Sequence, residues 1–183
     1  MSDRVVIVGA GQGGLQAAAS LRQEGFAGPI TLVGDEPGLP YQRPPLSKAY
    51  LLGKLEARKL LLRQEHWYAK QRVDLVLDRV VAVDRPGHQV HLAGGRSLPY
   101  DHLVLATGSR NRELPIPGAH LQGVIGMRTR EDADDLAARG FTIAEVANEA
   151  LGQYLGAANI FHGVNDDTRG SFRIRAHWTP QGS

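Results

Sequence analysis

A glycine-rich segment near the start of the chain restricts its fold more than any other feature. Residues 9–14 read Gly-Ala-Gly-Gln-Gly-Gly, which matches the pattern G-x-G-x-x-G. The β-branched run 5–8 precedes it, as in a strand buried on both faces. Apolar residues in 13–25 have helical spacing up to a glycine stop, and the run 30–33 predicts a second buried strand. The predicted order is therefore strand, tight turn, helix and strand.

Each glycine of this pattern has a mechanical role in a dinucleotide-binding turn. Gly9 permits the tight turn, Gly11 lets the backbone approach a pyrophosphate, and Gly14 lets the helix pack against the strand. The helix N-terminus offers backbone N–H groups to phosphate oxygens. Asp35 and Glu36 lie 21 and 22 residues beyond Gly14, where an acid accepts hydrogen bonds from a ribose. The segment therefore predicts a dinucleotide site.

The composition excludes several kinds of chemistry. The 183 residues are 42% hydrophobic and 22% charged, as in an ordinary globular protein. The absence of cysteine excludes disulfides, thiol catalysis and iron–sulfur ligation, so redox chemistry would need a bound cofactor. A net charge of +2, with scattered Lys and Arg, does not indicate a nucleic-acid partner. The longest early apolar run, 5–8, is too short for a signal peptide or membrane span, so we expect a cytoplasmic protein with no membrane association.

A stiff, basic segment follows the second predicted strand. Residues 40–50 read PYQRPPLSKAY, with two adjacent prolines between Arg43 and Lys48. Proline fixes φ and has no amide proton to donate, so this segment has little freedom. A stiff backbone that carries two cations favours a wall beside an anionic or electron-rich ligand over a flexible linker. Ser47 precedes a predicted short helix, 48–52, and is interpreted as its N-cap.

The middle of the chain predicts an antiparallel meander inserted into a parallel sheet. The run 73–77 predicts a third core strand, and 100–108 predicts a later buried strand that ends in Thr-Gly. Between them, three short runs separated by turn residues predict the meander: 80–84, 89–92 and 97–100. The predicted fold class is therefore α/β, a Rossmann-like doubly wound parallel sheet with a three-stranded antiparallel meander.

Five segments of the chain, taken in order, resemble one family. They read VVIVGAGQGG, GPITLVGDEP, LPYQRPPLSKAYL, LPYDHLVLATGSR and MRTREDADDL, and they cover about residues 3–139. They are similar to the ferredoxin reductase flavoproteins of the putidaredoxin and rubredoxin reductase type, in the glutathione-reductase-like class with two dinucleotide folds. The resemblance implies that FAD, not NAD, occupies the glycine turn. It also implies an oxidoreductase in which electrons pass from NAD(P)H through FAD to an iron–sulfur ferredoxin or rubredoxin.

The resemblance also implies where individual residues lie around FAD. Arg43 and Pro44 line the cofactor, and Lys48 approaches the flavin ring, where a cation would stabilise negative charge on the reduced flavin. Lys48 is thus the one catalytic candidate. Asn111 departs from the proline more usual at that position of the family. The implied cofactor contacts are Gly9, Gly11, Gly14, Asp35, Glu36, Arg43, Pro44, Lys48, the backbone at Val80, Ala106, Thr107, Gly108 and Arg112.

The resemblance ends near residue 139. We therefore expect an FAD-binding domain at 1–139, incomplete relative to the family, and an atypical tail at 140–183. The family's second G-x-G-x-x-G, which binds NAD(P)H, has no counterpart in this sequence, so the chain is interpreted as truncated and not competent alone.

The tail has a pattern of its own. An apolar stripe predicts a helix at 142–155, which a partner chain could cover, and alternation predicts a strand at 171–178 after a loop at 165–167.

Two alternative functions stay open. The chain could be a non-enzymatic nucleotide-binding or interaction module, or a remnant without function.

Other polar residues have simpler interpretations. His88, His91 and His102 are expected to be solvated or hydrogen-bonded, with no metal. His66, Trp67 and Tyr68 lie in a predicted helix, 64–71, where packing is the expected role. The acidic residues of a predicted helix near 130–139 are interpreted as a solvated face and early-turn charge: Asp132, Asp134 and Asp135.

Overall fold

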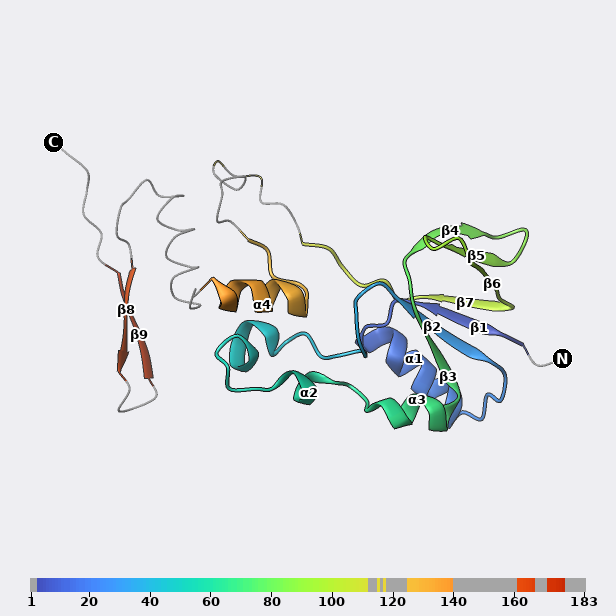
Figure 1. Cartoon of the computed structure of the whole chain (residues 1–183), viewed down its shortest axis with the longest axis horizontal. Helices are drawn as coiled ribbons and strands as arrows, with labels where there is room; N and C mark the ends of the chain where they lie inside the picture. Colours follow the sequence, from blue (N-terminus) through green and yellow to red (C-terminus); the bar gives the residue numbers. More distant parts are fainter. Residues whose placement is uncertain are drawn as a thin grey trace. The chain divides into compact units, whose positions relative to one another are not determined.

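The protein's structure is a computed structural model that describes residues 3–111, 115, 117, 125–139, 161–166 and 171–176 (Figure 1). The chain divides into two compact units. Unit 1 comprises Met1–Gln42 and Ala57–Ser109, and unit 2 comprises Arg43–Glu56 and Arg110–Ser183. The predicted domain boundary between residues 139 and 140 stays a prediction.

Unit 1 is built on a parallel sheet with an antiparallel meander. Its helices are α1 (Gln12–Gln23), α2 (Ala57–Leu60) and α3 (Glu65–Gln71). Its strands are β1 (Val5–Val8), β2 (Ile30–Gly34), β3 (Val73–Leu77), β4 (Val80–Asp84), β5 (Gln89–Leu92), β6 (Ser97–Pro99) and β7 (His102–Leu105). The parallel strands are arranged β3-β2-β1-β7, and the meander is arranged β4-β5-β6. The predicted α/β fold with an inserted meander is confirmed.

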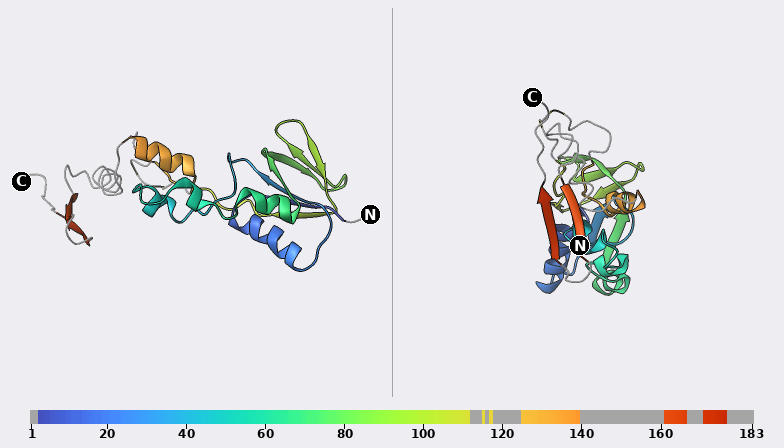
Figure 2. Two further views of the ribbon diagram at one scale, coloured as in Figure 1. Left: turned by 60° about the horizontal axis from the view of Figure 1, so that its bottom comes forward. Right: turned by 90° about the vertical axis from the view of Figure 1, so that its left-hand side faces the viewer.

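The two faces of β1 pack against different layers. Val5 and Ile7 belong to a core cluster that includes residues of α1 and α3, whereas Val6 and Val8 belong to a cluster with residues of the meander. This alternation follows from the period of two along a strand. Figures 1 and 2 show the same arrangement, with α1 and α3 on one face of the sheet and β4–β6 on the other. The meander therefore covers the face that a second layer of helices covers in a simple doubly wound domain.

The strand order reverses beside β1, which places the glycine turn at the switch point of the sheet. Leading from β1, the chain adds β2 and β3 on one side and returns with β7 on the other. Val8 pairs with Val33 and also with Leu105, so the residues after these three strands lie next to one another. Ligands of open parallel sheets bind at this place, beyond the carboxyl ends of the strands where the order reverses.

Unit 2 contains a one-turn π-helix, an α-helix and a hairpin among its described residues. They are η1 (Leu46–Tyr50), α4 (Arg130–Ala138), β8 (Phe161–Asp166) and β9 (Ser171–Ala176). The predicted cap at Ser47 is wrong, because η1 begins after Pro45 and contains Ser47 as its second residue. The Tyr50 N–H donates to the Pro45 carbonyl at 3.0 Å, five residues back. Proline already has a helix-compatible φ, which explains the earlier start.

The tail is only partly as predicted. Of the strand expected at 171–178, residues 171–176 form β9, and the last two lie outside the described residues. Asn165 and Asp166 are wrongly predicted as loop, because they pair with Phe172 and Ser171 at the end of β8. Backbone pairing up to the connection outweighs the turn preference of these two residues. The predicted helix at 142–155, and with it the docking surface for a partner chain, lies outside the described residues and stays a prediction.

In the described part of the chain, no helix has both the length and the apolar composition that crossing a bilayer requires.

Candidate functional site

Two glycines of the turn are packed against backbone. Gly9 has φ +112, and a Cβ built on it would lie 2.1 Å from the carbonyl oxygen of Ala106. A Cβ on Gly14 would lie 1.9 Å from the carbonyl oxygen of Gly9. Real Cβ atoms do not approach backbone so closely, so no other residue fits at either position without moving the main chain. This packing fits the structural roles predicted for both glycines, and their contact with a cofactor stays a prediction.

Gly11 is different, because a Cβ on it would meet nothing within 4 Å. It is the N-cap of α1, with extended backbone (φ −85, ψ −167), so the fold alone does not require glycine. The first N–H groups of a helix have no partner within the helix. Open space directly before these donors fits a pyrophosphate, which glycine would allow to approach the backbone. The turn therefore fits the phosphate part of a dinucleotide.

The carboxyl end of β2 lies directly against this turn. The Gly9 N–H donates to the Val33 carbonyl at 2.8 Å, and a Cβ on Gly34 would lie 2.5 Å from the Cβ of Ala10. Asp35 and Glu36 follow at once; Asp35 is exposed and Glu36 is half-buried. Both predicted acids are thus brought to the glycine turn.

The remaining predicted contacts of unit 1 lie on β4 and after β7. Val80 opens β4 and pairs with Leu92 of the meander. The Ala106 N–H donates to the Val8 carbonyl at 2.7 Å, which extends the β1–β7 pairing to the glycine turn. Thr107 and Gly108 follow in exposed positions, and Gly108 has φ +72.

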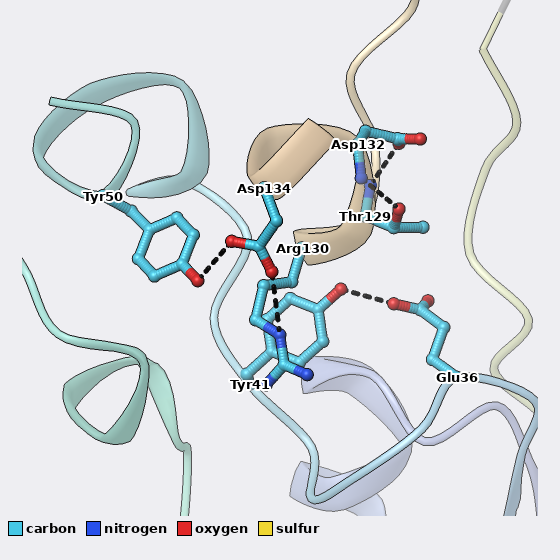
Figure 3. A network of polar contacts seen from close by, with 7 residues as sticks. All are labelled: Glu36, Tyr41, Tyr50, Thr129, Arg130, Asp132 and Asp134. Carbon is cyan, nitrogen blue, oxygen red and sulfur yellow. Dashed lines mark hydrogen bonds and ion pairs between the residues drawn. The ribbon is translucent and has the colours of Figure 1, made fainter. Parts of the chain in front are cut away.

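Residues 43–50 of the stiff basic segment belong to unit 2, where two contacts attach them to α4 and the residues before it. The Arg43 guanidinium donates to the Arg128 carbonyl at 2.6 Å. The Tyr50 hydroxyl donates to the Asp134 carboxylate at 2.7 Å, as Figure 3 shows. Burial, followed by the hydrogen bond to Asp134, raises the pKa of Tyr50. The segment is therefore held at both ends.

The predicted flavin-side residues lie on this segment. Pro44 and Lys48 are exposed, and the Lys48 Nζ donates to the Pro44 carbonyl at 3.2 Å. The chain departs from helical geometry at Lys48 (φ −134, ψ −114), in the middle of η1. Arg112 lies outside the described residues, so its predicted contact with the cofactor stays a prediction.

Asp132 lies in the first turn of α4, as predicted, but it is more than a solvated charge. Asp132 and Thr129 form a capping box (Figure 3). The Asp132 carboxylate accepts a hydrogen bond from the Thr129 N–H at 2.7 Å, and the Thr129 hydroxyl accepts one from the Asp132 N–H at 3.2 Å. The Arg128 N–H also donates to the Asp132 carboxylate at 2.7 Å. Burial acts to raise the pKa of Asp132, but the hydrogen bonds from Thr129 and Arg128 outweigh it, and the pKa is lowered from its ordinary value.

Asp132→Ala is expected to destabilise α4 by about 1 kcal/mol at neutral pH, the usual cost of losing such a cap. Because the folded pKa is lowered, the stabilisation is complete above the unfolded value of 3.8 and is lost as pH falls through the lower folded pKa. Urea unfolding followed by circular dichroism at pH 7 and at pH 3 measures the difference between wild type and variant. That difference should shrink at pH 3. Asp135→Ala, at an exposed position on the same helix, is the control and should show little effect at either pH.

Two of the histidine predictions are confirmed. The His91 Nδ1 lies 2.8 Å from the Ser97 hydroxyl, and the His102 Nε2 lies 3.1 Å from the Asp3 carboxylate, so both are hydrogen-bonded. Within the described ranges, no three His, Asp or Glu side chains are grouped so that they could hold a metal ion.

Tyr41 was not among the predicted site residues, but it contacts one of them. Its hydroxyl donates to the carboxylate of Glu36 (Figure 3). The sequence contained one signal of this contact, a tyrosine between Pro40 and Gln42 in a segment expected to be stiff. A buried tyrosine hydroxyl usually has a hydrogen-bond partner. Which partner it has depends on the tertiary structure.

Comparison with known proteins identifies the relatives of the chain. Rhodocoxin reductase of Rhodococcus erythropolis is 52% identical over 133 residues, which are 72% of this chain and 31% of that protein. The crystal structure of the ferredoxin reductase for the CYP199A2 system from Rhodopseudomonas palustris matches with a TM-score of 0.71 at 42% identity, over 84% of this chain and 41% of that one. The crystal structure of the covalent putidaredoxin reductase–putidaredoxin complex matches with a TM-score of 0.69 at 41% identity, over 81% of this chain and 40% of that one.

These matches confirm the predicted resemblance to ferredoxin reductases. The chain spans about a third of the length of the curated relatives it matches. Such reductases are FAD-binding flavoproteins, in agreement with the predicted cofactor. The model of the family described as pyridine nucleotide-disulphide oxidoreductase matches residues 3–145. The chain belongs to the pyridine nucleotide-disulphide oxidoreductase family.

Proposed function

We propose that this chain supplies the FAD-binding part of an NAD(P)H-dependent reductase that delivers electrons to an iron–sulfur ferredoxin or rubredoxin. The observation that carries the proposal is the contrast within the glycine turn. Gly9 and Gly14 are required by the packing of the turn, whereas Gly11 faces open space at the start of α1. A glycine that the fold does not require, at the N-terminus of a helix, supports a role in binding phosphate.

Residues of unit 1 would hold the adenylate and the pyrophosphate. The backbone N–H groups at the start of α1 would donate to the pyrophosphate, and the absence of a side chain at Gly11 would let them approach it. Asp35 or Glu36 would accept hydrogen bonds from the ribose hydroxyls. The backbone at Val80 would lie near the adenine, and Ala106, Thr107 and Gly108 would lie beside the flavin moiety.

Residues of unit 2 would serve the flavin. When bound, FAD supplies a group that accepts two electrons together and releases them singly. Arg43 and Pro44 would line the cofactor, as would Arg112. Lys48 would place a positive charge near the flavin ring, and a preorganised cation there stabilises negative charge more than water does. The contacts of Arg43 with Arg128 and of Tyr50 with Asp134 support this role, because they hold both ends of the segment that carries Lys48.

The electron acceptor and the source of electrons are proposed from the relatives. One related structure is a complex with putidaredoxin, and other relatives are named as reductases of rhodocoxin and ferredoxin. We propose an acceptor of the same iron–sulfur class, with rubredoxin as a second candidate. NAD(P)H oxidation is proposed to need a further nucleotide-binding region, so the 183-residue chain should not catalyse it alone. A cytoplasmic location stays a prediction.

The test is a visible absorption spectrum of the purified chain after incubation with FAD and desalting. We expect flavin bands that survive desalting, that NADH leaves unbleached and that dithionite bleaches. A protein that stays colourless at every FAD concentration would contradict the proposal. Rapid bleaching by NADH would contradict only the part that assigns NAD(P)H oxidation to a further region.

A further inference from the structure

The choice between Asp35 and Glu36 can be made from their surroundings in unit 1. Both follow β2, whose end touches the glycine turn through Gly34 and Ala10. Asp35 is exposed. Glu36 is half-buried, and its Oε2 accepts a hydrogen bond from the Tyr41 hydroxyl (Figure 3). Of the two acids, Glu36 is the one whose carboxylate is held by a neighbouring side chain.

Tyr41 is itself held by its surroundings. Its exposed fraction is 8%, and its backbone forms an antiparallel bridge with Leu61. On either side of the bridge, the Gln42 N–H donates to the Leu60 carbonyl at 2.9 Å and the Leu62 N–H donates to the Pro40 carbonyl at 3.0 Å. The segment 40–42 is therefore paired with 60–62 like a short ladder. A ring that is buried and mounted on paired backbone places its hydroxyl at a fixed point.

We propose that Tyr41 is a positioning residue of the adenosine site, whose hydroxyl orients the Glu36 carboxylate so that Glu36, rather than Asp35, accepts hydrogen bonds from the ribose hydroxyls. The inference rests on the proposed function of the glycine turn. A carboxylate has about four acceptor positions, so a carboxylate that accepts from Tyr41 can accept from other donors as well. Because the Glu36 side chain is already ordered, binding does not have to order it, and an ordering cost of about 0.5–1.5 kcal/mol is avoided.

The test uses Tyr41→Phe, which keeps the buried ring and removes only the hydroxyl. The probes are ADP and 2′,3′-dideoxy-ADP, titrated calorimetrically into the full chain. Wild type should bind ADP more tightly than the dideoxy compound. Tyr41→Phe should weaken ADP binding about three- to tenfold, which is the ordering cost expressed as affinity. It should leave binding of 2′,3′-dideoxy-ADP unchanged, since that probe has no hydroxyl for Glu36 to accept from.

Two further variants complete the design. Tyr100→Phe is the matched control, because Tyr100 is also buried in unit 1 but its hydroxyl lies 3.5 Å from the backbone carbonyl of Asp84. It should leave both affinities unchanged. In a Glu36→Gln background, Tyr41→Phe should have no further effect on ADP binding, because the carboxylate that it orients is gone.

The outcomes separate this inference from the proposed function. Equal weakening of both probes by Tyr41→Phe would mean a general loss of structure and would overturn the inference. So would a variant that binds ADP like wild type, or a wild type that does not distinguish the two probes. A wild type that binds neither ADP nor FAD would overturn the proposed function, and the inference with it.

Discussion

Gly9→Ala is expected to prevent unit 1 from folding, whereas Gly11→Ala is expected to leave the fold intact and to weaken FAD binding. At position 9 two independent effects add. A Cβ would lie 2.1 Å from the Ala106 carbonyl oxygen, and alanine would have to adopt φ +112. A backbone clash together with a disfavoured φ is expected to cost about 4 kcal/mol or more, which is a large part of the roughly 5–15 kcal/mol by which a typical domain is stable.

At position 11 neither effect exists. The backbone is extended and a Cβ would meet nothing within 4 Å, so the change in unfolding free energy should stay within about 1 kcal/mol. The methyl group would instead project into the space proposed for the pyrophosphate. If it displaces two charge-assisted hydrogen bonds, each worth about 1.5 kcal/mol, the affinity for FAD should fall about 100-fold. Circular dichroism measures the fold, and titration of flavin absorbance measures the affinity.

Gly13→Ala is the control for an added methyl group in the same turn. A Cβ at this position also meets nothing within 4 Å, and the residue lies within α1, where alanine is favoured over glycine. We expect a fold at least as stable as wild type and unchanged FAD binding. Gly11→Ala with wild-type affinity would show that the open space is not where the pyrophosphate binds. Gly9→Ala with wild-type stability would contradict the packing of the turn against Ala106.

The parts of the fold that could be predicted are those that local sequence determines. The runs 5–8 and 30–33 are β-branched or apolar throughout, and a strand buried on both faces needs no other information. The glycine turn was predictable for a related reason, because Gly9 is required for its φ and Gly14 for the close packing of the turn, both of which are local. The meander was predictable from its turn residues, since Pro, Gly and Ala-Gly-Gly separate three runs of strand length.

The parts that could not be predicted depend on contacts between distant residues. The hydrogen bond from Arg43 to the Arg128 carbonyl joins residues 85 apart, and no periodicity marks it. Glu36 and Tyr41 are only five residues apart, but their contact depends on the bridge between Tyr41 and Leu61. Asp132 is an exception, because its capping contact is local. The predicted helix already began near residue 130, and Thr129 followed three residues later by Asp132 has the spacing of a capping box, which the interpretation as solvated and early-turn charge did not use.

Arg22 is expected to be the polar side chain whose loss most destabilises unit 1. Its guanidinium donates to the carbonyls of Gln71 at 2.6 Å, Phe26 at 2.6 Å, Gly28 at 2.9 Å and Arg72 at 2.8 Å. These carbonyls belong to the loop after α1 and to the end of α3. Burial lowers the pKa of Arg22, as does the charge of Arg72, while Asp74 opposes the shift. Arginine nevertheless stays charged at neutral pH.

The hydrogen bond from Arg22 to the Arg72 carbonyl acts at the end of α3. Arg72 caps α3 with φ +51, a left-handed conformation that costs a non-glycine residue about 1 kcal/mol. The bond from Arg22 to its carbonyl helps to hold that conformation. The same guanidinium also joins α3 to the loop that leads into β2. The Arg22 side chain thus stabilises two connections of the parallel sheet, the one from α1 to β2 and the one from α3 to β3.

Arg22→Met, which keeps an unbranched apolar stem, is expected to lower the unfolding free energy of unit 1 by about 2–3 kcal/mol. A hydrogen bond from a charged donor is worth about 1.5–3 kcal/mol, but Arg22 is only half-buried, so water would satisfy several of the released carbonyls. Arg22→Lys should recover less than half of the loss, since an ammonium is a single donor centre and cannot reach four carbonyls as a planar fork does.

Urea unfolding followed by the fluorescence of Trp67 measures this effect. Trp67 lies in α3 and packs against the core cluster of α1, and a Trp178→Phe background leaves it as the only tryptophan. Arg96→Met, at an exposed position in the turn between β5 and β6, is the control and should change the unfolding free energy by less than about 0.5 kcal/mol. If Arg22→Met behaves like this control, the four carbonyls do not depend on Arg22. If Arg22→Lys is as stable as wild type, a single positive charge at the end of α1 is enough, and the fork geometry contributes nothing.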